Sequence, residues 1–299
     1  MPPNHLSYPS LKCVLENLEA IKRFHITART PSLQKIDKLV PIRFENLYMT
    51  GTELTINQLS IVFQPDMKII DYYLVSRSKI LLNQLDSNDG RQGLSFNLKL
   101  RVNCLHIRNK NHLEEAIQLI HPDSFPLKAV KTALNTATTS DHPIIKSART
   151  LILSTTRPPF YRPPQLEDIE KLHNETIIFE EDPFSSENLG IFEFIRYLKE
   201  SVPPGRTFII MQSDGYVTNH LSNVKMGYSR YMNPLDSVQE KFIPGAPRFL
   251  IPINDTSSIQ VYGIGKETNE RGMGWCEIET DFERRRQRQK VVIKVVSII

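Results

Sequence analysis

The chain has 299 residues, of which 40% are hydrophobic and 23% are charged, and its 37 basic and 33 acidic residues leave a net charge of +4. This composition is ordinary for a folded protein of about two domains, so it excludes a chain that is disordered or of low complexity. No apolar run approaches the roughly 18 residues of a membrane-spanning helix. The small net charge also gives no general reason to expect binding to nucleic acid or to a membrane.

The N-terminal residues 1–41 are predicted to form three short amphipathic helices. Their clearest apolar stripe has the spacing i, i+3, i+4 and i+7, which places its members on one helix face. It consists of Leu11, Val14, Leu15 and Leu18. Two further stripes include Phe24 and Ile36, and Pro31 fits the first turn of the third helix. A unit this small cannot bury enough apolar surface alone, so it must pack on the rest of the chain or on a partner.

Residues 42–93 are predicted to form a β-hairpin and a linker region. One short strand is centred on Phe44, and a second begins at Leu59 with alternating apolar residues. A turn at residues 50–52 would join the two strands as an antiparallel pair. The run 68–85 fits either a helix or a strand, whereas 86–93 (DSNDGRQG) predicts a loop and a subdomain boundary.

Residues 94–214 alternate between strand patterns and helix patterns. The predicted strands are 100–107, 127–134, 150–154, 175–179 and 207–211, and the predicted helices are 112–120, 141–148, 165–172 and 188–199. Asp141 is expected to cap the second of these helices. The strands recur at intervals of about 22 to 31 residues, which is the period of leucine-rich and related β/α repeats. This spacing favours a degenerate β/α solenoid, and an ordinary α/β sandwich is the alternative.

Residues 215–299 are predicted to be rich in β-structure. After a helix at 218–231, strands are expected at 248–253, 259–264, 274–279 and 291–296, and they suggest an antiparallel meander that closes the chain. The run 292–298 is so apolar that it should be paired rather than left at a sheet edge. The predicted class is therefore α+β or α/β: a helical unit, leucine-rich-repeat-like units and a terminal meander.

The sequence indicates no catalytic residue, no cofactor site and no metal site. Residues 263–268 (GIGKET) resemble a phosphate-binding loop only superficially, because the earlier glycine of that motif is missing and Lys266 is followed by Glu267. The eight histidines are scattered. The three cysteines, Cys13, Cys104 and Cys276, are far apart, as expected of reduced thiols buried in the core. We therefore expect a protein that is not an enzyme and has no cofactor.

Two segments have compositions that are found at binding surfaces. The basic run 284–290 (RRRQRQK) is typical either of a nucleic-acid contact or of a solvated hairpin turn. Residues 157–164 (RPPFYRPP) are typical either of a polyproline-like docking site or of a stiff connector between a strand and a helix. In both segments the structural interpretation is preferred.

The opening helices resemble an F-box. The resemblance rests on Leu6, Pro9, Val14, Leu15, Leu18, Arg23, Phe24, Leu33 and Ile36. Most of the chain resembles a large, nematode-expanded family of F-box-like proteins of uncharacterised function, through segments such as PIRFENLYMT, HPDSFPLKAVKTAL and RFLIPINDTSSIQVYGI. The resemblance implies a helical unit that binds the small linker subunit of a cullin-type ubiquitin ligase, and a body that recruits a protein target. The face expected to meet the linker comprises Leu11, Val14, Leu15, Leu18 and Phe24.

Two other functions stay open at this point. The N-terminal helices could pack permanently on the chain's own body, which would make it a different interaction protein or a structural protein. The basic run 284–290 could bind nucleic acid. The N-terminus, MPPNHLSYPSLK, lacks the pattern of a secretory leader, so we expect an intracellular location in the cytoplasm or nucleus and no membrane partner. The sequence identifies neither the target nor the oligomeric state.

Overall fold

The computed structural model describes residues 8–49, 53–62, 74, 80–87, 99–107, 113–132, 141–154, 166–180, 183, 190–212, 216–265 and 289–298. The chain divides into two compact units, Met1–Leu127 and Lys128–Ile299. Helices lie at the N-terminus, mixed β-structure follows in both units, and the C-terminal strands are antiparallel. The α+β class is therefore confirmed. Among the described residues, no helix is long and apolar enough to cross a membrane.

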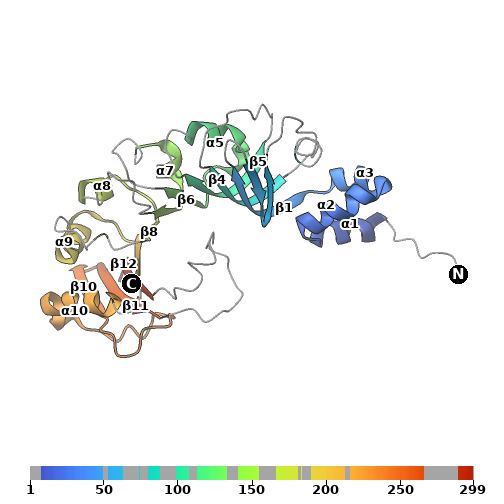
Figure 1. Cartoon of the computed structure of the whole chain (residues 1–299). Helices are drawn as coiled ribbons and strands as arrows, with labels where there is room; N and C mark the ends of the chain where they lie inside the picture. The colour runs from blue at the N-terminus through green and yellow to red at the C-terminus, as the bar shows by residue number, and fades with distance from the viewer. Residues whose placement is uncertain are drawn as a thin grey trace. The chain divides into compact units, whose positions relative to one another are not determined.

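The first unit begins with three helices, α1 (Tyr8–Asn17), α2 (Ala20–Arg29) and α3 (Pro31–Leu39), drawn in blue in Figure 1. Pro31 lies in the first turn of α3, where its missing N–H costs no helical hydrogen bond. Between α1 and α2, the side chain of Glu19 caps the second helix by accepting hydrogen bonds from the backbone N–H groups of Ile21 and Lys22, both at 3.0 Å. The three predicted helices are confirmed.

A mixed sheet follows in the same unit, with the strand order β5-β4-β1-β2-β3. The strands are β1 (Ile42–Met49), β2 (Glu53–Ile56), β3 (Leu59–Val62), β4 (Ile80–Ser87) and β5 (Leu100–Ile107). β4 is parallel to both β1 and β5, whereas β2 is antiparallel to both β1 and β3. The predicted direct pairing of β1 with β3 is wrong, because β2 lies between them. With only four residues, β2 is too short to show a clear alternation of its own.

Helix α5 (Leu113–Leu119) and the 3-10 helix η3 (Pro122–Ser124) come next in the first unit. The buried residues of α5 are Leu113, Ala116 and Leu119, whose spacing places them on one side of the helix. The hydroxyl of Ser124 accepts a hydrogen bond from the backbone N–H of Val102 at 3.0 Å, which holds η3 against β5. The predictions for 100–107 and 112–120 are thereby confirmed.

The second unit is built on four neighbouring parallel strands, β6 (Ala129–Thr132), β7 (Thr150–Leu153), β8 (Thr176–Phe179) and β9 (Thr207–Gln212). The helices that connect them are α7 (Pro143–Ser147), α8 (Leu166–Glu170) and α9 (Ile191–Ser201). These helices lie along one side of the strands in Figure 1. The predicted alternation of strand and helix is confirmed.

The cap of α7 differs from the prediction. His142, not Asp141, is the capping residue, and its Nδ1 accepts a hydrogen bond from the N–H of Ile144 at 3.3 Å. Asp141 instead forms an ion pair with Lys146 at 3.0 Å. Pro143 explains the shift, because proline favours the first helical position and the cap is the residue immediately before it.

The two faces of the parallel sheet differ in their exposure. In register across β7, β8 and β9, the side chains of Leu151, Ile177 and Phe208 are buried. The preceding residues Thr150, Thr176 and Thr207 are also in register, and because side chains alternate along a strand they lie on the opposite face, where they are half-buried. One face therefore contributes to the core, and the other is partly open.

The C-terminal part of the second unit contains α10 (Tyr216–Tyr228), the 3-10 helix η5 (Ser229–Tyr231), β10 (Phe249–Asn254), β11 (Ser257–Ile264) and β12 (Gln289–Ser297). The strand order is β10-β11-β12-β9, and each neighbouring pair is antiparallel. β12 has a partner on both sides, as predicted for its apolar sequence. The predicted strand 274–279 lies outside the described residues.

Candidate functional site

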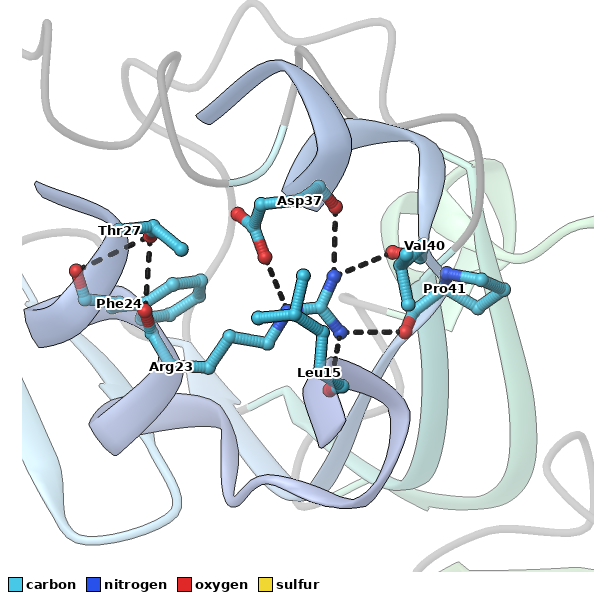
Figure 2. A network of polar contacts seen from close by, with 7 residues as sticks. All are labelled: Leu15, Arg23, Phe24, Thr27, Asp37, Val40 and Pro41. Carbon is cyan, nitrogen blue, oxygen red and sulfur yellow. Dashed lines mark hydrogen bonds and ion pairs between the residues drawn. The ribbon is translucent and has the colours of Figure 1, made fainter. Parts of the chain in front are cut away.

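The side chain of Arg23 lies at the centre of the three-helix head, which we define as residues 8–40, and it is 1% exposed (Figure 2). Its Nε donates to the carboxylate of Asp37 in a buried ion pair. Nη1 donates to the carbonyls of Leu15 at 3.2 Å and Pro41 at 2.8 Å. Nη2 donates to the carbonyls of Asp37 and Val40, both at 2.7 Å. Arg23 thereby links the end of α1, the end of α3 and the residue that precedes β1.

This arrangement satisfies every N–H group of the guanidinium, because an arginine side chain has five donors and each of them has an acceptor. A buried charge without such partners would cost several kcal/mol. The carbonyl acceptors lie near helix ends, where the backbone has no partner within its own helix. Arg23 therefore fixes the three helices relative to one another.

Two of the five predicted linker-binding residues lie in the core of the first unit. Leu15 is 2% exposed and Phe24 is 5% exposed. Phe24 also packs edge-to-face against Phe44 of β1, with ring centroids 6.0 Å apart. The expectation that all five side chains can meet a partner is therefore wrong for these two. Helical spacing identifies an apolar face, but it does not show which part of that face the chain covers itself.

The other three predicted residues are accessible to different degrees. Val14 is 49% exposed, and Leu11 and Leu18 are half-buried. Tyr8, one turn before Leu11, is 53% exposed. Tyr8, Leu11 and Val14 recur every three residues within α1, and Leu18 lies directly after the last residue of this helix. We call Tyr8, Leu11, Val14 and Leu18 the α1 surface.

The head exposes two more apolar side chains that sequence reasoning did not select. Leu39 at the end of α3 is 68% exposed, and Ile26 on α2 is 44% exposed. Both lie outside the apolar stripes from which the face was predicted. For Ile26 the sequence does contain a signal, because this residue is an apolar side chain between His25 and Thr27, whereas Leu39 is followed by the apolar Val40.

A polar contact ties the head to the sheet of the same unit. Asn57, in the turn between β2 and β3, has a positive φ of 55°, a conformation that asparagine tolerates. Its Nδ2 donates to Glu19 at 3.1 Å, and its Oδ1 accepts from the N–H groups of Glu45 at 2.9 Å and Asn46 at 3.2 Å. Glu19 therefore both caps α2 and contacts the hairpin turn.

The pKa of Glu19 reflects these contacts. Partial burial acts to raise the pKa, but hydrogen bonds from the backbone of Ile21 and Lys22 and from Asn57 oppose burial and outweigh it. The pKa of Glu19 therefore lies below its usual value, and the ionised carboxylate is the form that holds the contacts.

A buried pair of titratable residues lies on the sheet of the first unit. Asp86 of β4 and His106 of β5 are register partners, with His106 Nδ1 and Asp86 Oδ2 2.8 Å apart. Asp86 is 0% exposed and His106 is 7% exposed. The prediction of a loop over 86–93 is wrong at its start, because Asp86 and Ser87 extend β4. Because the sequence pattern places Asp86 in a loop, it does not predict this pair. A carboxylate that orients an imidazole occurs in acid–base sites as well as in protein cores.

The remaining candidates from the sequence do not form a site among the described residues. Gly263 lies in β11 and packs closely against α10. A Cβ at this position would lie 3.0 Å from the Val217 side chain and 3.1 Å from the Leu221 side chain. The segments 157–164 and 284–288 lie outside the described residues, and residues 289 and 290 begin β12. No group of three or more His, Cys, Asp and Glu side chains within the described part of the chain could hold a metal ion.

The cysteines differ from the prediction of buried thiols. Cys13 is exposed on α1, and Cys104 is half-buried in β5. Cys13 is two residues before the buried Leu15, so the two side chains lie on opposite sides of α1, and the Cys13 side faces solvent. Cys276 lies outside the described residues.

In the second unit, two buried polar side chains join successive β/α units. The amide Nδ2 of Asn174 donates to the carbonyls of Ile145 at 2.8 Å and Ala148 at 2.7 Å, at the end of α7. The guanidinium of Arg206 donates to the carbonyls of Asn174 at 3.2 Å and Leu172 at 2.6 Å. Asn174 lies just before β8 and contacts the end of α7, and Arg206 lies just before β9 and contacts the segment that follows α8. Successive β/α units are therefore joined to one another.

Comparison with known proteins gives one match. Residues 66–210 match the family model described as "Domain of unknown function (DUF3557)". This span includes β4 to β8 and most of β9, and it leaves the three-helix head, strands β1 to β3 and strands β10 to β12 outside. No curated protein and no solved structure matches the chain. Over 66–210 the chain is therefore similar to a domain family whose function is unknown.

Proposed function

We propose that this chain is a non-enzymatic interaction protein, an F-box-like adaptor that recruits a substrate to a cullin-type ubiquitin ligase in the cytoplasm or nucleus. The α1 surface binds the small linker subunit, and the second unit binds the target protein. The proposal places the chain in the nematode-expanded F-box-like family that its sequence resembles.

The observation that supports linker binding is the exposure of Val14 on a helix that is otherwise fixed in place. Leu15, the next residue, is buried, and its carbonyl accepts a hydrogen bond from Arg23. The helix is therefore held in one orientation, with Val14 facing solvent and Leu11 and Leu18 partly accessible beside it. A preformed apolar surface binds a partner with a smaller loss of conformational entropy than a flexible one.

The support for target binding is the architecture of the second unit. Parallel strands β6 to β9 alternate with helices, as in leucine-rich-repeat-like proteins, and one face of the sheet is partly open. Proteins built from such serial units commonly bind partners on an extended surface. The series of contacts through Asn174 and Arg206 would keep that surface in a constant shape.

A second candidate function is favoured by specific contacts of the head. Phe24 packs on Phe44, Arg23 donates to Pro41, and Glu19 contacts Asn57. These contacts would also be expected of a head that serves only to cover the first sheet. In that case the chain would be an interaction or structural protein that does not bind a ligase.

The two functions are separated by a binding experiment with the full chain and the purified linker subunit. Val14→Asp introduces a charge at the centre of the α1 surface, whereas Ile26→Asp introduces the same charge on α2 at a similarly exposed position. The adaptor function predicts that Val14→Asp weakens linker binding at least about tenfold, a loss of roughly 1.4 kcal/mol, and that Ile26→Asp has little effect.

The melting temperatures of both variants should stay close to that of the unchanged protein, because both residues are exposed. No association of the unchanged chain with the linker at micromolar concentration would refute the adaptor function. Leu15→Asp cannot replace Val14→Asp in this experiment, because a charge at a buried position would unfold the head and abolish binding for either function.

A further inference from the structure

The end of α10 carries an exposed group of aromatic, methionine and arginine side chains. Met226 is 77% exposed and Met232 is 49% exposed. Tyr228 and Tyr231, both half-buried, come between these methionines in the sequence, and Phe192 of α9 stacks on Tyr228 with ring centroids 6.1 Å apart. We call this group the α10 patch: Phe192, Arg196, Lys225, Met226, Tyr228, Arg230, Tyr231 and Met232.

The aromatic rings of the α10 patch are packed against one another. The ring of Tyr228 lies 6.3 Å from that of Tyr231, and the guanidinium of Arg230 lies 4.6 Å from the centre of the Tyr231 ring. Gly227 lets Phe192 approach α10 closely, because a Cβ at this position would lie 2.5 Å from the Phe192 ring. Phe192, Tyr228, Tyr231 and Arg230 are therefore an ordered cluster built by α9, α10 and η5.

The charge of the α10 patch is positive. Arg196 on α9, Lys225 on α10 and Arg230 on η5 are all exposed. The carboxylate of Glu193 lies 4.0 Å from Arg196 and offsets part of that charge. The three cations outnumber this carboxylate, so the patch attracts a negatively charged partner.

The composition indicates which kind of negative partner fits. Tyrosine, arginine and methionine are enriched at protein–protein interfaces, and flexible methionine side chains adapt to different apolar surfaces. Single-stranded nucleic acid needs open ring faces on which bases can stack. Here the rings face one another or Arg230, which favours a protein over a nucleic acid.

We propose that the α10 patch binds a protein segment in which Asp or Glu residues alternate with apolar residues. The carboxylates pair with Arg196 and Arg230, and the apolar side chains contact Met226 and Met232. Within the proposed adaptor function, which this inference rests on, the α10 patch is a second contact for the target, in addition to the partly open face of the sheet. The binding itself does not require the linker subunit, so it can be tested separately.

The test is fluorescence anisotropy of the full chain with short labelled probes. The first probe is a peptide of alternating Asp, Leu and Phe residues. A second peptide has Lys in place of Asp, a third has Ser in place of Leu and Phe, and the fourth probe is an oligothymidylate. The proposal predicts that only the first probe binds well, and that its affinity falls as salt is raised from about 50 mM to about 500 mM.

Four variants locate the binding. Three of them, Arg196→Glu, Arg230→Glu and Met226→Ser, should each lower the affinity for the first probe at least about fivefold. Lys241→Glu makes the same charge change at an exposed position outside the patch and should leave the affinity unchanged. Because these residues are exposed, the melting temperature should change little, which separates lost binding from lost folding.

Gly227→Ala provides an independent check of the geometry. Alanine is favourable in an exposed helix, so the fold should persist. The new methyl group displaces the Phe192 ring, so the affinity for the first probe should fall. Equal binding of the Lys-containing peptide, tighter binding of the oligothymidylate, or no effect of any patch variant would overturn the proposal. None of these outcomes bears on whether the α1 surface binds the linker.

Discussion

Arg23 and Asp37 form a buried ion pair that joins α2 to α3. Their side chains are 1% and 3% exposed, and the same guanidinium also holds four backbone carbonyls. The head therefore depends on a polar centre as well as on its apolar residues. This centre fixes which side of α1 faces solvent, and so it determines the surface that a partner would meet.

Replacement of Arg23 tests this role directly. Arg23→Met keeps much of the side-chain volume but leaves Asp37 and the carbonyls without their donor, so we expect a loss of about 3–5 kcal/mol in the free energy of unfolding. Urea denaturation followed by circular dichroism measures it. Lys22→Met, an exposed neighbour, serves as the control and should change stability by no more than about 0.5 kcal/mol. A loss below about 1 kcal/mol for Arg23→Met would contradict the central role of this residue.

The Asp86–His106 pair should be energetically coupled. Asp86→Asn and His106→Gln each remove part of a buried polar contact, and each should lower the free energy of unfolding by about 1–3 kcal/mol. In a double-mutant cycle the two losses should fail to add, by about 0.5–3 kcal/mol, because the second substitution removes a group whose partner is already gone. Additive losses would show that the two side chains do not depend on each other.

The stability that Glu19 contributes should depend on pH in a defined direction. Its pKa is lower in the folded protein than the ordinary 4.5, so its contribution is present above that value and is lost as the pH falls through the folded-state pKa. Glu19→Ala should therefore lower the melting temperature at pH 7, and the difference should shrink in acid. Glu16→Ala, which removes only a surface contact with Lys12 at 3.9 Å, is the comparison. A Glu19→Ala effect that is constant with pH would rule out this explanation.

Asn174 should stabilise the connection between successive β/α units. Its side chain is 2% exposed and donates two hydrogen bonds, so Asn174→Ala should cost about 1–3 kcal/mol by leaving the carbonyls of Ile145 and Ala148 without those donors. Asn219→Ala, at an exposed position on α10, should have a much smaller effect. If Asn174→Ala unfolds at the same urea concentration as Asn219→Ala and the unchanged protein, Asn174 is not a structural link.

Long periodic segments of the fold could be predicted from the sequence. The apolar spacing in residues 8–40 and the β-rich run at 100–107 each span several turns or alternations, so local pattern and tertiary structure agree there. The strand β2 and the end of β4 could not be predicted in the same way. β2 has only four residues, and Asp86 resembles a loop residue until β5 supplies His106 beside it.

The candidate site could be predicted only as a face. The spacing of Leu11, Val14, Leu15 and Leu18 predicts one apolar face, of which the first three residues lie in α1 and Leu18 lies directly after its end. It cannot show that Leu15 turns into the core while Val14 remains exposed, because that depends on α3 and on the guanidinium of Arg23. The α10 patch could not be predicted because Phe192 and Arg196 of α9 are distant in the sequence from α10 and η5 and meet Tyr228 only after folding.

Hydrogen–deuterium exchange of the full chain, with and without the purified linker subunit, tests the central claim most directly. If the α1 surface is the docking site, the backbone amides of residues 8–18 should exchange more slowly in the presence of the linker, and Val14→Asp should abolish that protection. Unchanged exchange over residues 8–18 at a linker concentration that saturates any binding would contradict the claim and leave the helices as a structural part of the first unit.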